Sequence, residues 1–306
     1  MPLPTDEQLL KLANDLLLAL DHKFGVHPGF RPAHARGVLV KGVFTPTAAA
    51  PKLSKGPHFG RASTPVTVRF SSGTGFPMIS DVDPKANPRG MATRFHLEER
   101  VHTDIIGQSA NGFPVRTGSE FLEFMRVAGI PAELEKFLAA HPAAKRFLEM
   151  PKPNPVSFAT EAFFGVSAME FENVQGVKRF GRFRLVPEAE VKHLTSEDLA
   201  GKGESYLFDE LHGRMMAAPV GFRILVQLAG VGDVVDDATV QWPETRELME
   251  VGRMVLTEFQ EEDAAAQKHI IFDPIPRVEG IEPSEDPLLE LRAAIYLLSG
   301  RRRRSA

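Results

Sequence analysis

Short β-rich segments separated by Gly, Pro and Asn turns recur along this chain of 306 residues, and they limit its possible folds more than any other feature. They cover residues 38–44, 65–71, 91–97, 102–106, 168–186, 220–230 and 252–259. The longest contains Gln175-Gly176, which predicts a hairpin. Apolar residues at three- and four-residue spacing predict helices over 118–128, 131–150 and about 287–303. We therefore predict the α+β class, with an antiparallel β-barrel, inserted helices and a C-terminal helix.

The first 25 residues carry the pattern of an amphipathic helix. Thr5 and Gln8 have the spacing of a capping box, and Gly25 supplies a stop signal. One face is apolar and is formed by Leu9, Leu12, Leu16 and Leu20. Charged residues interrupt the Leu-rich run, which argues against a signal peptide, and no stretch approaches the roughly 20 apolar residues that span a membrane. We expect a single domain over residues 1–306 that is cytoplasmic and has no membrane span.

Composition excludes several kinds of site. The chain has no Cys, which rules out disulfides, zinc ribbons, iron–sulfur clusters and thiolate-ligated haem. A formal net charge of -4 argues against a nucleic-acid partner, because binding phosphates needs a basic face. None of the ten His residues has another at i, i+4 spacing on a predicted helix, so a metal site built from several His is poorly supported.

One helical motif near the C-terminus is informative because the chain has only two Tyr. Arg292 and Tyr296 are four residues apart and share one face, to which Arg303 nearly returns. A guanidinium beside a phenol favours the phenolate, which is a known ligand of haem iron. Such a pair is also often structural, with the ring in the core and the hydroxyl capped. Tyr206 has no such arginine, so Tyr296 is the candidate if an oxygen atom holds haem.

A loop histidine, His34, lies just before the first β segment. Read alone, such a residue is more often exposed or hydrogen-bonded than catalytic. Six segments in order, however, resemble the haem catalases from about residue 30 to the C-terminus. They are RPAHARG (31–37), PVTVRFSSGTG (65–75), NPRGMATRF (87–95), DDATVQWPE (236–244), VGRMVL (251–256) and FDPIPRVEGIEPSEDPLLELRAAIY (272–296). More narrowly, the chain is similar to the small catalase-related haem peroxidases, which keep the barrel and lack the C-terminal catalase domain.

The resemblance implies a role for each matching residue, with haem b as the cofactor. Tyr296, on a proximal helix over 284–303, matches the ligand of the haem iron, and Arg292 matches the residue that keeps it ionised. His34 matches the distal acid–base residue and Ser71 its hydrogen-bond partner. The arginines that hold the two propionates are matched by Arg31, Arg69 and Arg303. Aromatic positions at the distal pocket and the haem edge are matched by Phe113, Phe121 and Phe124.

Two positions depart from the family pattern. Gln108 stands where the family has its distal Asn, and Asn111 is the alternative if the loop shifts. Both side chains offer an amide N–H, although Gln has the longer reach. Ser167 stands where full-length catalases have a His that supports the proximal Arg. We therefore expect a less finely tuned phenolate and weaker catalase turnover.

The resemblance implies a haem-dependent peroxidase that reduces hydrogen peroxide or organic hydroperoxides with an external small-molecule electron donor, with weak catalase activity beside it. Two other functions stay open on the same scaffold. One is a lyase or isomerase that rearranges lipid hydroperoxides, and the other is a haem-binding sensor with little turnover. By analogy with the family, we expect a monomer or a homodimer.

Overall fold

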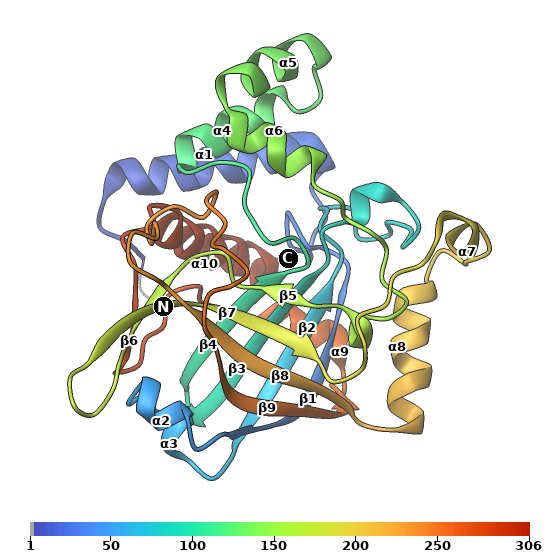
Figure 1. The fold of residues 1–306 in the computed structure, drawn as a ribbon. Helices are drawn as coiled ribbons and strands as arrows, with labels where there is room; N and C mark the ends of the chain where they lie inside the picture. Colours follow the sequence, from blue (N-terminus) through green and yellow to red (C-terminus); the bar gives the residue numbers. More distant parts are fainter. Residues whose placement is uncertain (1–2) are drawn as a thin grey trace.

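The computed structural model describes residues 3–306 and centres on a β-barrel (Figure 1). Among the described residues, the strands that close it run antiparallel in the order β7, β5, β4, β3, β2, β1, β9, β8. The circle is completed by β7 and β8, which pair from Gly181 with Leu228 to Pro187 with Phe222. The bounds are β1 Gly37–Pro46, β2 Thr64–Ser71, β3 Gly90–Glu98, β4 Val101–Gln108, β5 Phe163–Phe164, β7 Lys178–Pro187, β8 Val220–Leu228 and β9 Leu248–Phe259. Beyond β7, the sheet continues through β6 (Met169–Glu172) and β10 (Ile281–Pro283).

Strand β2 is buried on both faces, which is unusual for a barrel strand with one side toward solvent. Val66, Val68 and Phe70 belong to the main core cluster. The alternating residues Arg69 and Ser71 point to the opposite face and are only 3% and 4% exposed. Since Arg69 and Ser71 are polar and buried, other elements must cover the face of β2 that carries them. The site described below lies on this covered face.

Three helices from distant parts of the sequence pack together beside the barrel (Figure 1). They are α1 (Glu7–Phe24), α4 (Gly118–Val127) and α10 (Leu288–Ser305), and α1 contacts both of the others. Their shared core contains Leu16, Leu122 and Leu291. Gly118 lies so close to Leu291 that a Cβ atom would collide with it. This close packing fixes the position of α10, the helix that carries Tyr296.

The remaining helices are short. They are α2 Ala50–Leu53, α3 Pro57–Gly60, α5 Pro131–Ala140, α6 Pro142–Glu149, α7 Ser196–Ala200, α8 Tyr206–Ala217, α9 Asp263–His269 and the 3₁₀ turns Pro84–Ala86 and Phe158–Thr160. No helix in residues 3–306 combines the length and apolarity needed to cross a membrane.

The structure confirms the α+β barrel and the predicted strands, and it corrects four details. The capping residue of α1 is Asp6, whose carboxylate accepts from the backbone of Gln8 and Leu9, rather than Thr5. The predicted helix 131–150 is two helices, because Pro142 has no N–H to continue the first. The C-terminal helix begins at Leu288, not at residue 284. Strands β5 and β10 were not predicted, since two or three residues are too few to show an alternating pattern.

Candidate functional site

The ends of three adjacent strands bring Ser71, Gly90 and Gln108 side by side. Ser71 of β2 pairs with Gly90 of β3, which in turn pairs with Gln108 of β4. Directly opposed residues in antiparallel strands point to the same face. His34 lies over this row, with its Nδ1 atom 3.1 Å from the Ser71 hydroxyl oxygen.

Gly90 makes the approach of His34 possible. A Cβ atom built on Gly90 would lie 2.6 Å from Ser71 Oγ and 2.8 Å from His34 Nδ1. Both distances are far below van der Waals contact, so any larger residue would push the imidazole off the strand. Sequence reasoning did not assign Gly90 a role, although it lies within the NPRGMATRF segment (87–95).

His34 has a strained backbone, with φ 54°, one of the few non-glycine residues in the left-handed region. Such a conformation costs about 1–3 kcal/mol and persists only where neighbours enforce it. Two backbone hydrogen bonds do so here. Ala35 N donates to Thr74 O at 3.0 Å, and Ser72 N donates to Arg36 O at 3.0 Å. The segment carrying His34 is thereby tied to the end of β2.

The electrostatics of the site keep His34 neutral. Burial, followed by the positive charges of Arg69, Arg31 and Arg292, lowers the pKa of His34 from 6.5 to about 4. At neutral pH the ring is therefore uncharged and can accept a proton. No hydrogen bond within residues 3–306 reaches its second nitrogen, Nε2.

On α10, Arg292 and Tyr296 face each other as their spacing predicts. The guanidinium of Arg292 donates to the Tyr296 hydroxyl at 3.4 Å and lies 5.8 Å from the centre of its ring. Burial lowers the pKa of Arg292, but the interactions with Tyr296 and the charge of Asp286 outweigh burial and raise it. A fully charged guanidinium therefore lies beside the Tyr296 oxygen.

Asp286 is a buried carboxylate that sequence reasoning missed. It is 4% exposed, and one of its oxygens accepts from the backbone of Leu288 at 2.9 Å, in the first turn of α10. Its other oxygen and the Ser167 hydroxyl have no hydrogen-bond partner within the described chain. Burial raises the pKa of Asp286, and the nearby Ser167 hydroxyl partly opposes that rise. Ser167 therefore neighbours Asp286, which in turn acts on Arg292. An acidic residue just before a helix was the available signal.

Two buried arginines, Arg69 and Arg303, and the half-buried Arg31 gather without a carboxylate partner. Arg31 and Arg303 donate to the same carbonyl oxygen, Ile270 O, at 3.0 and 2.9 Å. Arg69 donates to Gln267 at 2.7 Å and to Ala35 O at 3.1 Å. None of the three forms an ion pair with any acidic residue in residues 3–306, and Arg303 Nε has no partner there.

These arginines repel one another. Burial and the charges of Arg69 and Arg303 hold the pKa of Arg31 well below its usual range. Burial, then Arg303, lowers the pKa of Arg69 to about 9. Buried cations without counter-ions fit an anionic ligand with more than one carboxylate. With a phenol oxygen able to hold iron on α10 and a neutral His34 that reaches Ser71 from the loop before β1, the residues present fit the haem that the resemblance implies.

The two candidate amides differ in position. Gln108 shares a face with Ser71 and donates to Gly112 O at 2.6 Å. Asn111 instead donates to Glu244 at 3.4 Å in an exposed pair. Gln108 is therefore the amide that lies with the His34–Ser71 pair, whereas the Asn111 side chain is engaged on a surface loop.

The predicted aromatic residues divide into two groups. Phe113 and Phe121 are half-buried, with ring centres 5.4 Å apart, and Phe121 packs on the cluster that contains Leu291 of α10. Phe124 is buried and packs against Phe137 of α5 at 5.7 Å, within the α4–α5 core. The first pair borders the helix of Tyr296, while Phe124 has a structural place.

Comparison with known proteins identifies the family of this chain. The family model "Catalase" matches residues 29–306. A "Catalase-related peroxidase" from Mycolicibacterium paratuberculosis is 35% identical over 90% of this chain and 89% of its own length. A protein of the same description from Synechococcus elongatus is 31% identical over 94% of this chain and 87% of its own length.

Solved structures show the same fold. A fungal catalase has a TM-score of 0.81 at 23% identity, and catalase A from Saccharomyces cerevisiae has a TM-score of 0.81 at 22% identity. Each match covers 94% of this chain but only 62% and 64% of those longer chains. The barrel, the ordered motifs and the match over residues 29–306 confirm the resemblance: this chain belongs to the catalase family.

Proposed function

We propose that this protein is a haem-dependent peroxidase that reduces hydrogen peroxide or organic hydroperoxides with an external electron donor. The observation that carries the proposal is a neutral, strained His34 paired with Ser71, close enough to Arg292 and Arg31 for their charges to act on it. The relatives described as catalase-related peroxidases support it, since they are 35% and 31% identical, whereas a catalase-A from Dictyostelium discoideum and a catalase from Pseudomonas syringae are 26% and 28% identical.

The chain's own residues would hold haem b as follows. Tyr296 would hold the iron, with Arg292 keeping its oxygen ionised. Arg31, Arg69 and Arg303 would bind the two propionates, since guanidinium groups pair with carboxylates in a fork geometry. Bound haem would supply the redox chemistry of oxygen–oxygen cleavage, which no side chain of this protein can perform alone.

The protein then has to move one proton. Neutral His34 accepts a proton from the incoming peroxide and returns it to the oxygen that leaves as water or alcohol. The contact with Ser71 at 3.1 Å fixes the orientation of the imidazole ring. Gln108 uses one of its two N–H donors on Gly112, which leaves the other for a peroxide oxygen.

The test measures donor oxidation and oxygen release in the same haem-loaded sample, with hydrogen peroxide or tert-butyl hydroperoxide and a phenolic donor. We expect donor oxidation to exceed oxygen release, and His34→Ala to lower it by about 10²–10⁴-fold, the usual contribution of a general acid–base residue. No donor oxidation with any peroxide, or oxygen release that always dominates, would overturn the proposal. Rearrangement of a fatty-acid hydroperoxide without a donor would point to a lyase or isomerase instead.

A further inference from the structure

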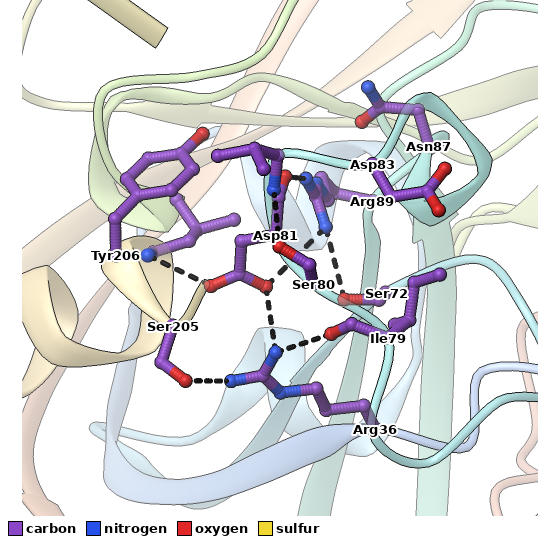
Figure 2. Close-up of polar contacts among 12 residues, drawn as sticks. Arg36, Ser72, Ile79, Ser80, Asp81, Asp83, Asn87, Arg89, Ser205 and Tyr206 are labelled. Atoms are coloured by element: carbon purple, nitrogen blue, oxygen red, sulfur yellow. Dashed lines mark hydrogen bonds and ion pairs between the residues drawn. The ribbon is translucent and has the colours of Figure 1, made fainter. Parts of the chain in front are cut away.

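Arg36, Asp81 and Arg89 form an ion cluster around a buried carboxylate (Figure 2). Its centre is Asp81, whose side chain has no exposed surface. One carboxylate oxygen lies 3.4 Å from Arg36 Nη1 and 3.9 Å from Arg89 Nη1. The other oxygen accepts from the backbone of Leu207 at 2.9 Å, next to the start of α8.

Arg89 connects this cluster to β2 and β4. It is fully buried and directly precedes Gly90. Its guanidinium donates to the Ser72 hydroxyl at 3.0 Å, to the Asp81 carbonyl at 2.6 Å and to Asn154 at 3.2 Å. Its backbone exchanges two hydrogen bonds with Ser109, at 2.9 and 2.8 Å. Ser72 and Ser109 are the direct neighbours of Ser71 and Gln108.

Arg36 connects the same cluster to His34, two residues earlier in the chain. Its guanidinium donates to Ile79 O at 2.5 Å and to the Ser205 hydroxyl at 2.8 Å (Figure 2). It also lies 4.5 Å from the ring centre of Phe208. Through its backbone, Arg36 accepts from Ser72 N. Asp81 thus holds two arginines, each one or two residues from a site residue.

We propose that Arg36, Asp81 and Arg89 are positioning residues that hold His34, Ser71 and Gln108 in register. The cluster contacts the chain neighbours of these residues, Ser72 and Ser109, so it acts through the backbone and does not touch substrate. A strained His34 needs such support on both sides, because relaxing its φ of 54° would carry the imidazole away from Ser71. This inference rests on the proposed function in one respect, the role of His34 as the acid–base residue.

The test uses three variants and one matched control. Arg89→Met removes the guanidinium, Arg89→Lys keeps its charge without the fork geometry, and Asp81→Asn keeps the acceptor for Leu207 while removing the negative charge. The control is Arg182→Met, which removes an equally buried guanidinium that donates to Val240 O at 2.6 Å and Asp237 O at 3.0 Å. It therefore separates loss of a buried arginine from loss of this cluster.

Hydrogen exchange by mass spectrometry is the first readout, and it requires neither peroxide nor turnover. The backbone amides of Ala35, Ser72 and Ser109 report directly, since each is bonded across the segments in question. We expect peptides containing them to exchange at least about tenfold faster in Arg89→Met and Asp81→Asn than in Arg182→Met at equal global stability. Exchange no faster than in the control would overturn the proposal.

The second readout is kcat normalised to bound haem. A variant that is only less stable contains fewer folded, haem-loaded molecules, but each of them keeps the wild-type kcat. We expect kcat to fall about 10²-fold in Arg89→Met with the donor KM unchanged, and to recover in part in Arg89→Lys. A wild-type kcat per haem in Arg89→Met would overturn the positioning role. Failure of the proposed function would show separately, as a His34→Ala variant with full activity.

Discussion

Gly90 is the position where one added methyl group most directly disturbs the His34–Ser71 pair. In Gly90→Ala the new Cβ would lie 2.6 Å from Ser71 Oγ and 2.8 Å from His34 Nδ1, so both must retreat by about 0.6–0.8 Å to regain ordinary contact at about 3.4 Å. Overpacking of this kind costs about 1–3 kcal/mol, and loss of the hydrogen bond adds about 1 kcal/mol. A displacement near 1 Å at a reacting group lowers kcat by about 10²-fold.

The assay pairs urea unfolding with steady-state donor oxidation, normalised to bound haem. Gly213→Ala is the matched control, because it adds the same methyl group on α8 where nothing lies within 4 Å. We expect it to leave kcat unchanged and to stabilise the fold by about 0.4–1 kcal/mol. If Gly90→Ala keeps both wild-type stability and wild-type kcat, the close approach of His34 to β3 does not matter for function and the reasoning fails.

Three further predictions address the charges and amides of the site. His34 must be neutral to accept a proton, and its pKa is lowered from 6.5 to about 4. The rate constant with peroxide is therefore expected to stay level from about pH 7 to pH 5 and to fall as pH drops through about 4. A fall centred near pH 6.5 contradicts this prediction. Arg31→Gln weakens haem binding by at least about tenfold, or ~1.4 kcal/mol, which transfer of haem to an acceptor protein measures; an unchanged transfer rate removes Arg31 from the cofactor site. Gln108→Leu lowers kcat while Asn111→Ala does not, because only Gln108 lies on the face of Ser71, and the reverse result assigns the distal amide to Asn111.

Most of the fold that could be predicted came from patterns among residues close together in the sequence. The strands were found because each is short and bounded by turn residues, and Tyr296 with Arg292 was found because a four-residue spacing is a property of one helix. The pairing of β7 with β8 that closes the barrel joins residues about forty apart, and no local pattern records it. The break at Pro142 was missed because the apolar spacing continues across it.

Long-range contacts account for what the sequence did not show about the site. Asp286 was missed because its influence on Arg292 depends on the turn before α10. The Asp81 cluster was missed because its partners, Arg36, Arg89 and Ser205, are far apart along the chain. Read alone, His34 looked ordinary in its loop; the resemblance paired it with Ser71, as the structure does, whereas its positive φ is visible only in the structure.

The central claim is that this protein holds haem through Tyr296. The most direct test is the absorbance spectrum of wild type and Tyr296→Phe after identical loading with haem. We predict that wild type retains haem with a strong Soret band, and that the variant either loses haem or shows a shifted band, because phenylalanine has no oxygen to bind iron. The same spectrum and the same haem content in both proteins would contradict the account.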